Sequence, residues 1–254
     1  MTTWLLLRGL TRGAGHWGSF VGRFKEAMPH SQVIALDLPG NGVLHQQRSA
    51  TTVSEMVAQC RCQLSVRAIA PPYHVLAMSL GAMVAVEWAS SYPQDIAASV
   101  LINTSLRPYN PFYQRLRPDN YMTLLKLMLG RPGPLAWEQA ILRMTSNQNA
   151  SNALSEWVAL RERFNVSSRN ALAQLAAAAR YSAPAHPPSC SMLLLVSDKD
   201  RLVSAACSEA IAQRWQCTLR RHGSAGHDLP LDDGPWVIDQ TRNWIQHRDL
   251  ERTA

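Results

Sequence analysis

Polar residues that could act together in catalysis each follow an apolar run. Ser79 comes directly after "YHVLAM", with small residues two positions before it and two and three positions after it. Small neighbours around a serine at a strand-to-helix corner are typical of a nucleophile elbow, because larger side chains do not fit the sharp turn. Carboxylates follow "MLLLVS" at Asp198 and Asp200, and His227 lies in the Gly-rich stretch "RRHGSAGHDLP". Since open α/β sheets build their sites at the carboxyl ends of strands, the pattern indicates one shared site, although a buried corner can match the serine pattern by chance.

A second motif competes with this interpretation. Residues 13–18 are a literal G-x-G-x-x-G, and Asp37 ends the next apolar run, where a ribose-binding carboxylate would be expected. In a dinucleotide fold, however, the first glycine follows the strand directly, whereas here the turn Arg8-Gly9-Leu10 follows it. We therefore expect no cofactor, and we expect Asp37 to brace the turn "DLPGNG" by hydrogen bonding to its backbone.

The elements that must position these residues alternate along the chain. Apolar runs of strand length lie at residues 3–8, 32–37, 73–78, 98–103, 192–197 and 217–221. Helical patterns lie at 17–28, 52–68, 80–91, 204–215 and 235–247, and the second opens with the capping-box sequence Thr52-Val53-Ser54-Glu55. Continuous apolar runs indicate strands covered on both faces, so the sequence predicts an α/β fold with an essentially parallel sheet of about six strands.

The alternation stops between residues 105 and 188. Pro-rich stretches begin and end this segment, and helical patterns lie within it at 120–129, 135–145, 151–165 and 168–180. We therefore predict a core domain formed by residues 1–104 and 189–254, with an inserted helical cap at 105–188.

At this point the chain resembles the α/β-hydrolase superfamily, in particular the small capped esterases that include pimeloyl-acyl-carrier-protein methyl ester esterases. The resemblance rests on five stretches in order: "RGL" as the oxyanion turn, "DLPGNG", "AMSLGA" as the elbow, "SDKDRLV" as the acid loop and "GSAGHDLP" as the histidine loop. It implies an α/β-hydrolase fold. Arg8 is the main departure, since the family usually has histidine before that glycine.

The resemblance also implies roles for individual residues. Ser79 would attack an acyl carbonyl, His227 would take its proton and Asp200 would orient and stabilise the imidazolium. The family spacing favours Asp200 over Asp198 as the acid. The backbone N–H groups of Leu10 and Leu80 would bind the oxyanion.

Several functions fit this arrangement. The leading hypothesis is a serine carboxylic-ester hydrolase that acts on a small-molecule ester through an acyl-enzyme. Thioesterases, acyltransferases and carbon–carbon bond lyases share the fold, so the elbow alone does not separate them. A non-catalytic ligand receptor that keeps a triad-like pocket is the alternative from another class.

Most of the net charge of +7 lies in the predicted cap, where residues 107–180 hold ten basic and four acidic side chains. This charge could be a solvated helix face, or it could attract an acidic carrier protein or an anionic substrate. The large apolar cap residues are expected to be mostly core: Met122, Leu125, Met128, Trp137, Met144 and Trp157. Charges of the last loop, Asp228, Asp232 and Asp233, are expected to be solvated, His222 to end a strand, and His16 to line the pocket.

Composition limits the remaining possibilities. No apolar run reaches the ~18 residues of a membrane span, and "WLLL" is too short for a signal peptide. The five cysteines form no C-x-x-C pair and the histidines show no zinc spacing, so we expect reduced thiols and no metal site. We therefore expect a soluble, cytoplasmic protein without nucleic-acid partners.

Overall fold

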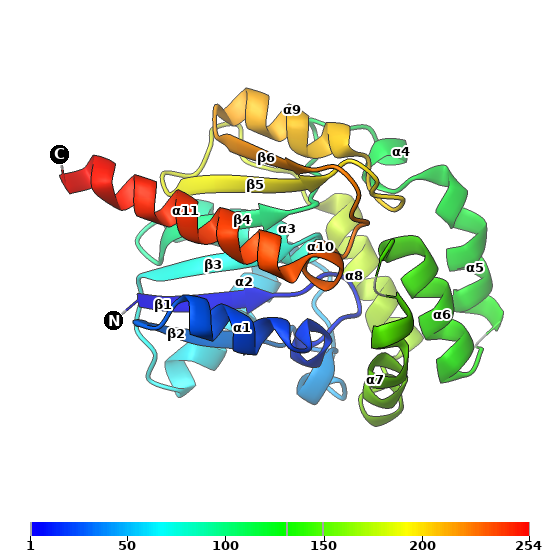
Figure 1. Cartoon of the computed structure of the whole chain (residues 1–254). Helices are drawn as coiled ribbons and strands as arrows, with labels where there is room; N and C mark the ends of the chain where they lie inside the picture. Colours follow the sequence, from blue (N-terminus) through cyan, green and yellow to red (C-terminus); the bar gives the residue numbers. More distant parts are fainter. Residues whose placement is uncertain (1, 131, 149, 254) are drawn as a thin grey trace.

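The structure of the protein, a computed structural model, describes residues 2–130, 132–148 and 150–253. Six strands form one sheet in the order β2-β1-β3-β4-β5-β6, and every neighbouring pair is parallel (Figure 1). The strands are β1 (Thr2–Leu7), β2 (Ser31–Leu36), β3 (Tyr73–Met78), β4 (Ile96–Ile102), β5 (Ser191–Ser197) and β6 (Thr218–His222). The predicted α/β fold with a six-stranded parallel sheet is confirmed.

Helices cover both faces of this sheet. They are α1 (Phe20–Ala27), α2 (Val53–Val66), α3 (Leu80–Ser91), α9 (Ala205–Trp215) and α11 (Gly234–Thr253). Alternate residues of a strand point to opposite faces, so Leu5 belongs to the core cluster on the face of α2, α3 and α9, whereas Leu6 belongs to the cluster on the face of α1 and α11. Burial on both faces explains why the strands are apolar without interruption.

Local signals set the helix boundaries close to where the sequence predicts them. Thr52 caps α2 by accepting a hydrogen bond from the backbone N–H of Glu55, at 3.2 Å. Helix α3 begins directly after the corner at Ser79, as the elbow motif requires. Short turns of helix lie in the loops: η1 (Ala14–Trp17), η2 (Gly42–Leu44) and α10 (Leu229–Asp232).

A helical insertion lies between β4 and β5, next to the carboxyl ends of the strands (Figure 1). Its elements are α4 (Phe112–Arg115), η3 (Pro118–Asn120), α5 (Tyr121–Gly130), α6 (Pro134–Thr145), α7 (Ala150–Arg163) and α8 (Ser168–Arg180). This insertion is consistent with a cap. The division into a core (1–104 and 189–254) and a cap (105–188) stays a prediction.

For two of the six apolar cap residues that were expected to be mostly core, the expected burial is wrong. Met122 and Leu125 of α5 are 61% and 49% exposed, whereas Trp137, Met144 and Trp157 are buried. Helix α5 is apolar on nearly every side, so its sequence does not distinguish the packed face from the outer one.

A buried polar network attaches α8 to the loops of the core. Gln174 is fully buried, and its amide nitrogen donates to Asn41 Oδ1 at 2.8 Å and to Ser49 Oγ at 2.9 Å. Its Oε1 accepts from the backbone N–H of Thr11 at 2.8 Å. One turn earlier, Asn170 Oδ1 accepts from the backbone N–H of Ser49 at 3.0 Å. Because buried polar groups are costly without partners, this network fixes the position of α8 above the sheet.

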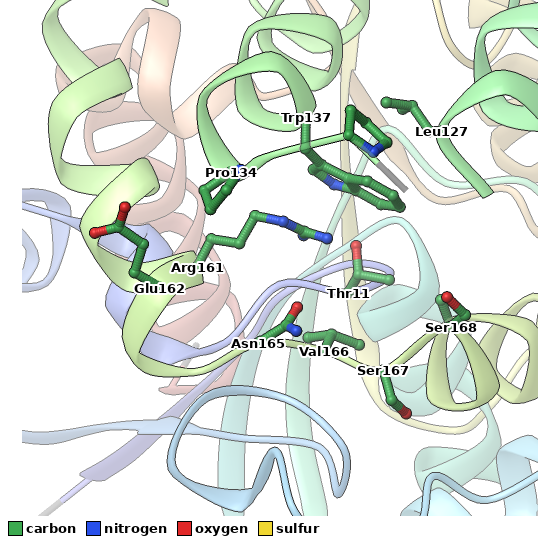
Figure 2. A pocket seen from close by; sticks show the side chains of 12 residues that line it. Thr11, Leu127, Pro134, Trp137, Arg161, Glu162, Asn165, Val166, Ser167 and Ser168 are labelled. Carbon is green, nitrogen blue, oxygen red and sulfur yellow. The ribbon is translucent and has the colours of Figure 1, made fainter. Parts of the chain in front are cut away.

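An ion cluster attaches α6 and α7 to the loop after β1. The buried carboxylate of Glu138 lies 2.7 Å from Arg12 and 3.6 Å from Arg161. The Arg161 guanidinium stacks over the ring of Trp137 at 3.9 Å, an arrangement visible in Figure 2. The positive charge of Arg161 therefore lies inside the insertion and not on its outer surface.

Candidate functional site

Ser79 occupies the corner between β3 and α3 in a backbone conformation that L-residues rarely adopt, with φ 54° and ψ −119°. The space around it explains the small neighbours. A Cβ on Gly81 would lie 2.6 Å from the carbonyl oxygen of Arg8 and 2.7 Å from that of Leu7, and Ala77 is fully buried. The corner therefore holds a strained serine against the end of β1, as a nucleophile elbow does.

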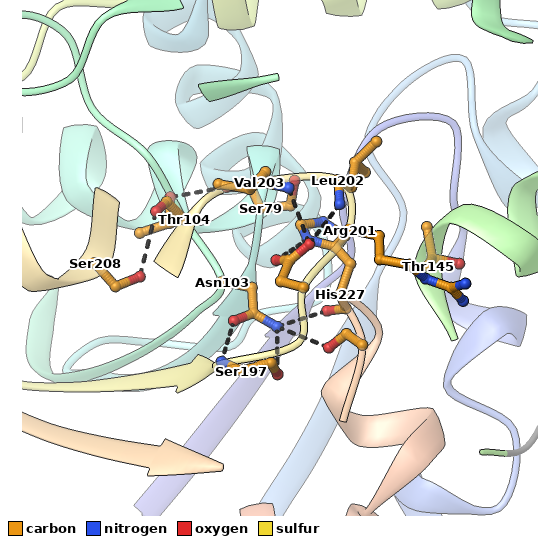
Figure 3. Close-up of polar contacts among 12 residues, drawn as sticks. Ser79, Asn103, Thr104, Thr145, Ser197, Arg201, Leu202, Val203, Ser208 and His227 are labelled. Atoms are coloured by element: carbon orange, nitrogen blue, oxygen red, sulfur yellow. Dashed lines mark hydrogen bonds and ion pairs between the residues drawn. The ribbon is translucent and has the colours of Figure 1, made fainter. Parts of the chain in front are cut away.

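Asp200 and His227 meet across two loops at the same edge of the sheet. The Nδ1 atom of His227 lies 2.7 Å from Asp200 Oδ2, and both side chains are buried (Figure 3). The other carboxylate oxygen of Asp200 accepts from the backbone N–H groups of Leu202 at 2.7 Å and Val203 at 2.9 Å. The carboxylate is thereby held in the orientation that contacts the histidine.

Asp198 lies in a different environment. Its side chain is 32% exposed and pairs with Arg221 at 2.7 Å, on the outer side of the loop. The geometry therefore favours Asp200, and not Asp198, as the partner of His227.

Asn103, which the sequence analysis missed, holds the acid strand and the histidine loop together. Its amide nitrogen donates to the carbonyl oxygens of His227 at 2.8 Å and Gly226 at 3.3 Å, and its Oδ1 accepts from the backbone N–H of Ser197 at 2.8 Å (Figure 3). The signal was present in the sequence, because Asn103 is a polar residue immediately after the apolar run of β4.

The turn after β1 lies directly against the serine. A Cβ on Gly9 would lie 3.1 Å from the Cβ of Ser79, and Leu10 lines the same cavity as Ser79. Leu80 is the first residue of α3, where helix geometry leaves the backbone N–H without a partner inside the helix. Leu10 and Leu80 thus both lie beside the serine, and their role in binding an oxyanion stays a prediction.

Asp228 is buried, so the expectation that its charge is solvated is wrong. It is 2% exposed and forms a bidentate ion pair with Arg8, in which Arg8 Nη1 donates to Asp228 Oδ1 at 3.0 Å. The Arg8 guanidinium also lies 4.9 Å from the ring centre of Trp17. This pair joins the residue before Gly9 to the residue after His227, and it gives Arg8 a structural reason to replace the usual histidine.

Asp232 is also buried, contrary to expectation. Its carboxylate accepts from Ser146 Oγ at 2.5 Å and from the backbone N–H groups of Asn147 at 2.9 Å and Gly226 at 2.7 Å. It therefore binds the end of α6 to the histidine loop. Asp233 is 36% exposed and contacts His222, which ends β6 as predicted, at 3.0 Å.

A cavity of about 160 Å³ lies between two of the predicted catalytic residues, Ser79 and His227, and the insertion. Ser79, His227 and Leu10 lie in its wall, together with Leu80. Apolar side chains of the insertion complete it: Leu116, Leu124, Ile141, Met144, Leu175 and Ala178. In the described part of the chain no hydrogen bond joins Ser79 Oγ to His227, a contact that is often long before substrate binds.

Other residues of the protein fill the space beside the G-x-G-x-x-G loop and bind its backbone. Asp37 Oδ1 accepts from the backbone N–H of Ala14 at 2.5 Å, and Oδ2 accepts from that of Val43 at 2.9 Å. A Cβ on Gly13 would lie 2.6 Å from the Cα of Gly42. Asp37 thus braces both this loop and the "DLPGNG" turn. Its carboxylate accepts the hydrogen bond from the backbone N–H of Ala14 that a bound phosphate would need.

His16 lies beside this loop, in a second cavity lined also by Arg8. Its pKa is held well below the usual value, mainly by burial and then by the charges of Arg12 and Arg8. Its ring therefore stays neutral at ordinary pH, close to Arg12 Nη1 at 3.0 Å.

Other features of the described residues bear on cofactors and membranes. Within 2–130, 132–148 and 150–253, no group of three or more His, Cys, Asp or Glu side chains is arranged to hold a metal ion. None of the helices in these ranges is both long enough and apolar enough to cross a membrane.

Comparison with known proteins agrees with the observed fold. The model of a family described as "Alpha/beta hydrolase family" matches residues 4–240, whereas no curated protein matches the sequence significantly. Three solved structures illustrate the likeness of the fold. A thermophilic esterase from Thermogutta terrifontis is 19% identical, with a TM-score of 0.73 over 97% of this chain and 90% of its own. The enol-lactonase from Burkholderia xenovorans LB400 is 14% identical, with a TM-score of 0.78 over 96% and 91%. The esterase RhEst1 from Rhodococcus sp. ECU1013 is 15% identical, with a TM-score of 0.76 over 96% and 90%.

Proposed function

The chain belongs to the α/β-hydrolase family, and we propose that it is a serine hydrolase that cleaves carboxylic esters through an acyl-enzyme. One observation carries this proposal. His227, which lines the same cavity as the strained Ser79, forms a buried contact with Asp200 at 2.7 Å. A histidine oriented by a carboxylate next to a serine is the arrangement that nucleophilic serine catalysis needs.

In the first half of the reaction, Ser79 Oγ attacks the ester carbonyl carbon while His227 Nε2 takes the hydroxyl proton. Asp200 keeps the other ring nitrogen as the donor and stabilises the imidazolium. The backbone N–H groups of Leu10 and Leu80 bind the oxyanion, each contributing about 3 kcal/mol to the transition state. His227 then gives its proton to the leaving alcohol, and the acyl group stays on Ser79.

In the second half, a water molecule attacks the acyl-enzyme. His227 takes a proton from this water, the tetrahedral intermediate collapses, and Ser79 recovers its proton as the carboxylic acid leaves. The volume and apolar lining of the cavity support an acyl group of small or medium size.

Two narrower proposals concern the substrate and the cellular location. The likeness to pimeloyl-acyl-carrier-protein methyl ester esterases makes a carrier-bound ester a candidate substrate, and the exposed basic residues Arg107, Lys126 and Arg143 of the insertion support an acidic partner. The five cysteines are free thiols, which supports the predicted cytoplasmic location.

The test is an ester panel of graded acyl length on the native protein and on Ser79→Ala. We expect the variant to fold normally, because the corner loses only an oxygen atom, and to lose turnover by about 10⁴-fold or more. Equal rates in both proteins would exclude the serine mechanism.

A fluorophosphonate probe separates the remaining alternatives. A working serine hydrolase should be labelled at Ser79, whereas a ligand receptor with a misaligned triad should not be labelled. Labelling without turnover of aryl esters would favour a lyase of the same fold.

A further inference from the structure

A third cavity, of about 450 Å³, lies among the helices of the insertion and is distinct from the one beside His16. We call it the cap cavity and define it by Thr11, Leu127, Trp137, Arg161, Ser168 and Ala171, which lie in its wall (Figure 2). Thr11 also lines the cavity that contains Ser79, so the two cavities share one residue.

Arg161 gives the cap cavity an incompletely compensated positive charge. Its side chain is 13% exposed, and its nearest carboxylate, Glu138, lies 3.6 Å away and is shared with Arg12 at 2.7 Å. The Arg161 guanidinium carries five N–H donors, and among the described residues its carboxylate partner is Glu138. Burial lowers the pKa of Arg161 to about 10, so the group remains charged at neutral pH.

Two further features of the wall lie close to Arg161 or carry positive potential. The ring of Trp137, itself nine-tenths buried, packs against the Arg161 guanidinium at 3.9 Å. Ser168 lies in the first turn of α8, whose N-terminus carries a partial positive charge. Glu162 belongs to the same wall, but in Figure 2 its carboxylate points away from Arg161.

The same helix faces line both cavities. On α6, Trp137 lines the cap cavity, whereas Ile141 and Met144 line the cavity of Ser79. These positions are four and seven residues apart, and therefore lie on one side of the helix.

Helix α8 repeats the pattern. Ala171 lines the cap cavity, and Leu175 and Ala178 line the cavity of Ser79. A separation of seven helical residues corresponds to about 10 Å along each axis. The two cavities thus lie at the two ends of one apolar track between α6 and α8.

We propose that this track is a substrate groove, in which an ester bond at Ser79 is joined through an apolar chain to an anionic end group that binds Arg161 in the cap cavity. This inference rests on the proposed hydrolase function and narrows its substrate class to esters with a carboxylate-like tail. The tail would lie about 10 Å from the reacting carbonyl, since that is the length of the shared helix faces.

The test compares aryl esters of two kinds, with carboxylate-terminated and methyl-terminated acyl chains of equal, graded length. We expect Arg161→Gln to raise KM about ten- to a hundredfold for the carboxylate ester of best-fitting length, the range for losing a charge-assisted hydrogen bond. KM for the methyl-terminated ester should not change.

Arg163→Gln is the matched control, because it removes the same charge from the same helix but at an exposed position above Phe164. It should leave both KM values within about twofold, since exposed charges are screened by solvent and salt. Equal effects of Arg161→Gln and Arg163→Gln would overturn the proposal, as would an equal rise of KM for both esters.

Ser168→Asp keeps the test valid if Arg161→Gln folds poorly. An acidic residue in the first turn favours the helix, yet it places a carboxylate in the cap cavity, so only the carboxylate ester should bind more weakly. Unchanged KM for that ester would contradict the proposal.

Direct binding separates this proposal from the esterase proposal. In Ser79→Ala, the dissociation constants of the two matching acyl-chain probes, a dicarboxylic monoamide and the monocarboxylic amide of equal length, can be measured by calorimetry without turnover. Tighter binding of the carboxylate probe that is lost in Ser79→Ala/Arg161→Gln would support the subsite even if no ester is hydrolysed. Equal binding of both probes would overturn it.

Discussion

The buried pair of Arg8 and Asp228 allows a quantitative prediction, because both side chains are almost completely removed from solvent. Arg8→Met and Asp228→Leu each leave an uncompensated buried charge. Removing one partner of such a pair costs about 3–5 kcal/mol of unfolding free energy. For a chain of this size, that corresponds to a fall in Tm of about 6–20 °C.

The double variant Arg8→Met/Asp228→Leu should recover most of this loss. Replacing both charges by apolar groups of similar volume is often neutral or stabilising, because the desolvation cost of the ions is also removed. Urea unfolding of the four proteins gives the coupling energy, which we expect to reach several kcal/mol.

An exposed pair supplies the control. Arg242 and Asp239 lie 2.9 Å apart on α11, but their side chains are 44% and 55% exposed. The same double-mutant cycle there should give a coupling of about 0–1 kcal/mol.

Activity gives a second measurement on the Arg8 and Asp228 variants. The pair connects the residue before Gly9 with the residue after His227, so single variants that still fold should lose kcat. Additive losses of stability in the double variant, with a coupling below about 0.5 kcal/mol, would refute the structural role assigned to the pair.

Two further predictions concern single side chains. Asp200→Asn should lower kcat by about 10⁴-fold, because asparagine favours the wrong histidine tautomer, whereas Asp198→Asn, at an exposed ion pair, should change kcat little; the reverse order in steady-state kinetics would move the acid to Asp198. His16 has a folded pKa well below its unfolded value near 6.5, so the unfolded chain binds more protons as pH falls below 6.5 and stability is lost there, by at most about 1.4 kcal/mol per pH unit. The His16→Gln variant should lose less unfolding free energy than the native protein between pH 7.5 and 5.5, and an identical loss in both would exclude His16 as the cause.

The sheet and its helices were predictable because their signals are local. Each strand is a short apolar run, and each helix begins at a recognisable cap or corner such as Thr52 or Ser79. The elbow was predictable for the same reason, since the steric demand on Gly81 comes from a turn of a few residues. The choice of Asp200 over Asp198 required information beyond the local sequence, because the spacing within the acid loop had to be compared with that of a family.

The buried charges were not predictable in the same way. Asp228 lies 220 residues from Arg8 in the chain, so the sequence around either residue does not indicate that the other is its partner. An aspartate in a Gly-rich loop is normally solvated, and burial of its charge becomes favourable only when the fold supplies a partner. The one available signal was Arg8 itself, a charged residue that directly continues the buried run "WLLL".

The glycines of residues 13–18 show that one sequence motif, G-x-G-x-x-G, can arise from different steric requirements. In a dinucleotide site, glycines leave room for a pyrophosphate to approach the backbone. Here Gly13 leaves room for Gly42, and Gly15 leaves room for Leu160 of α7, where a Cβ would lie 2.6 Å from Cδ2. The loop that follows the oxyanion turn is therefore also a contact surface for the insertion. A larger residue at Gly15 would push α7 outward, and with it Arg161, so this loop couples the position of the cap cavity to the position of the turn that is proposed to bind the oxyanion.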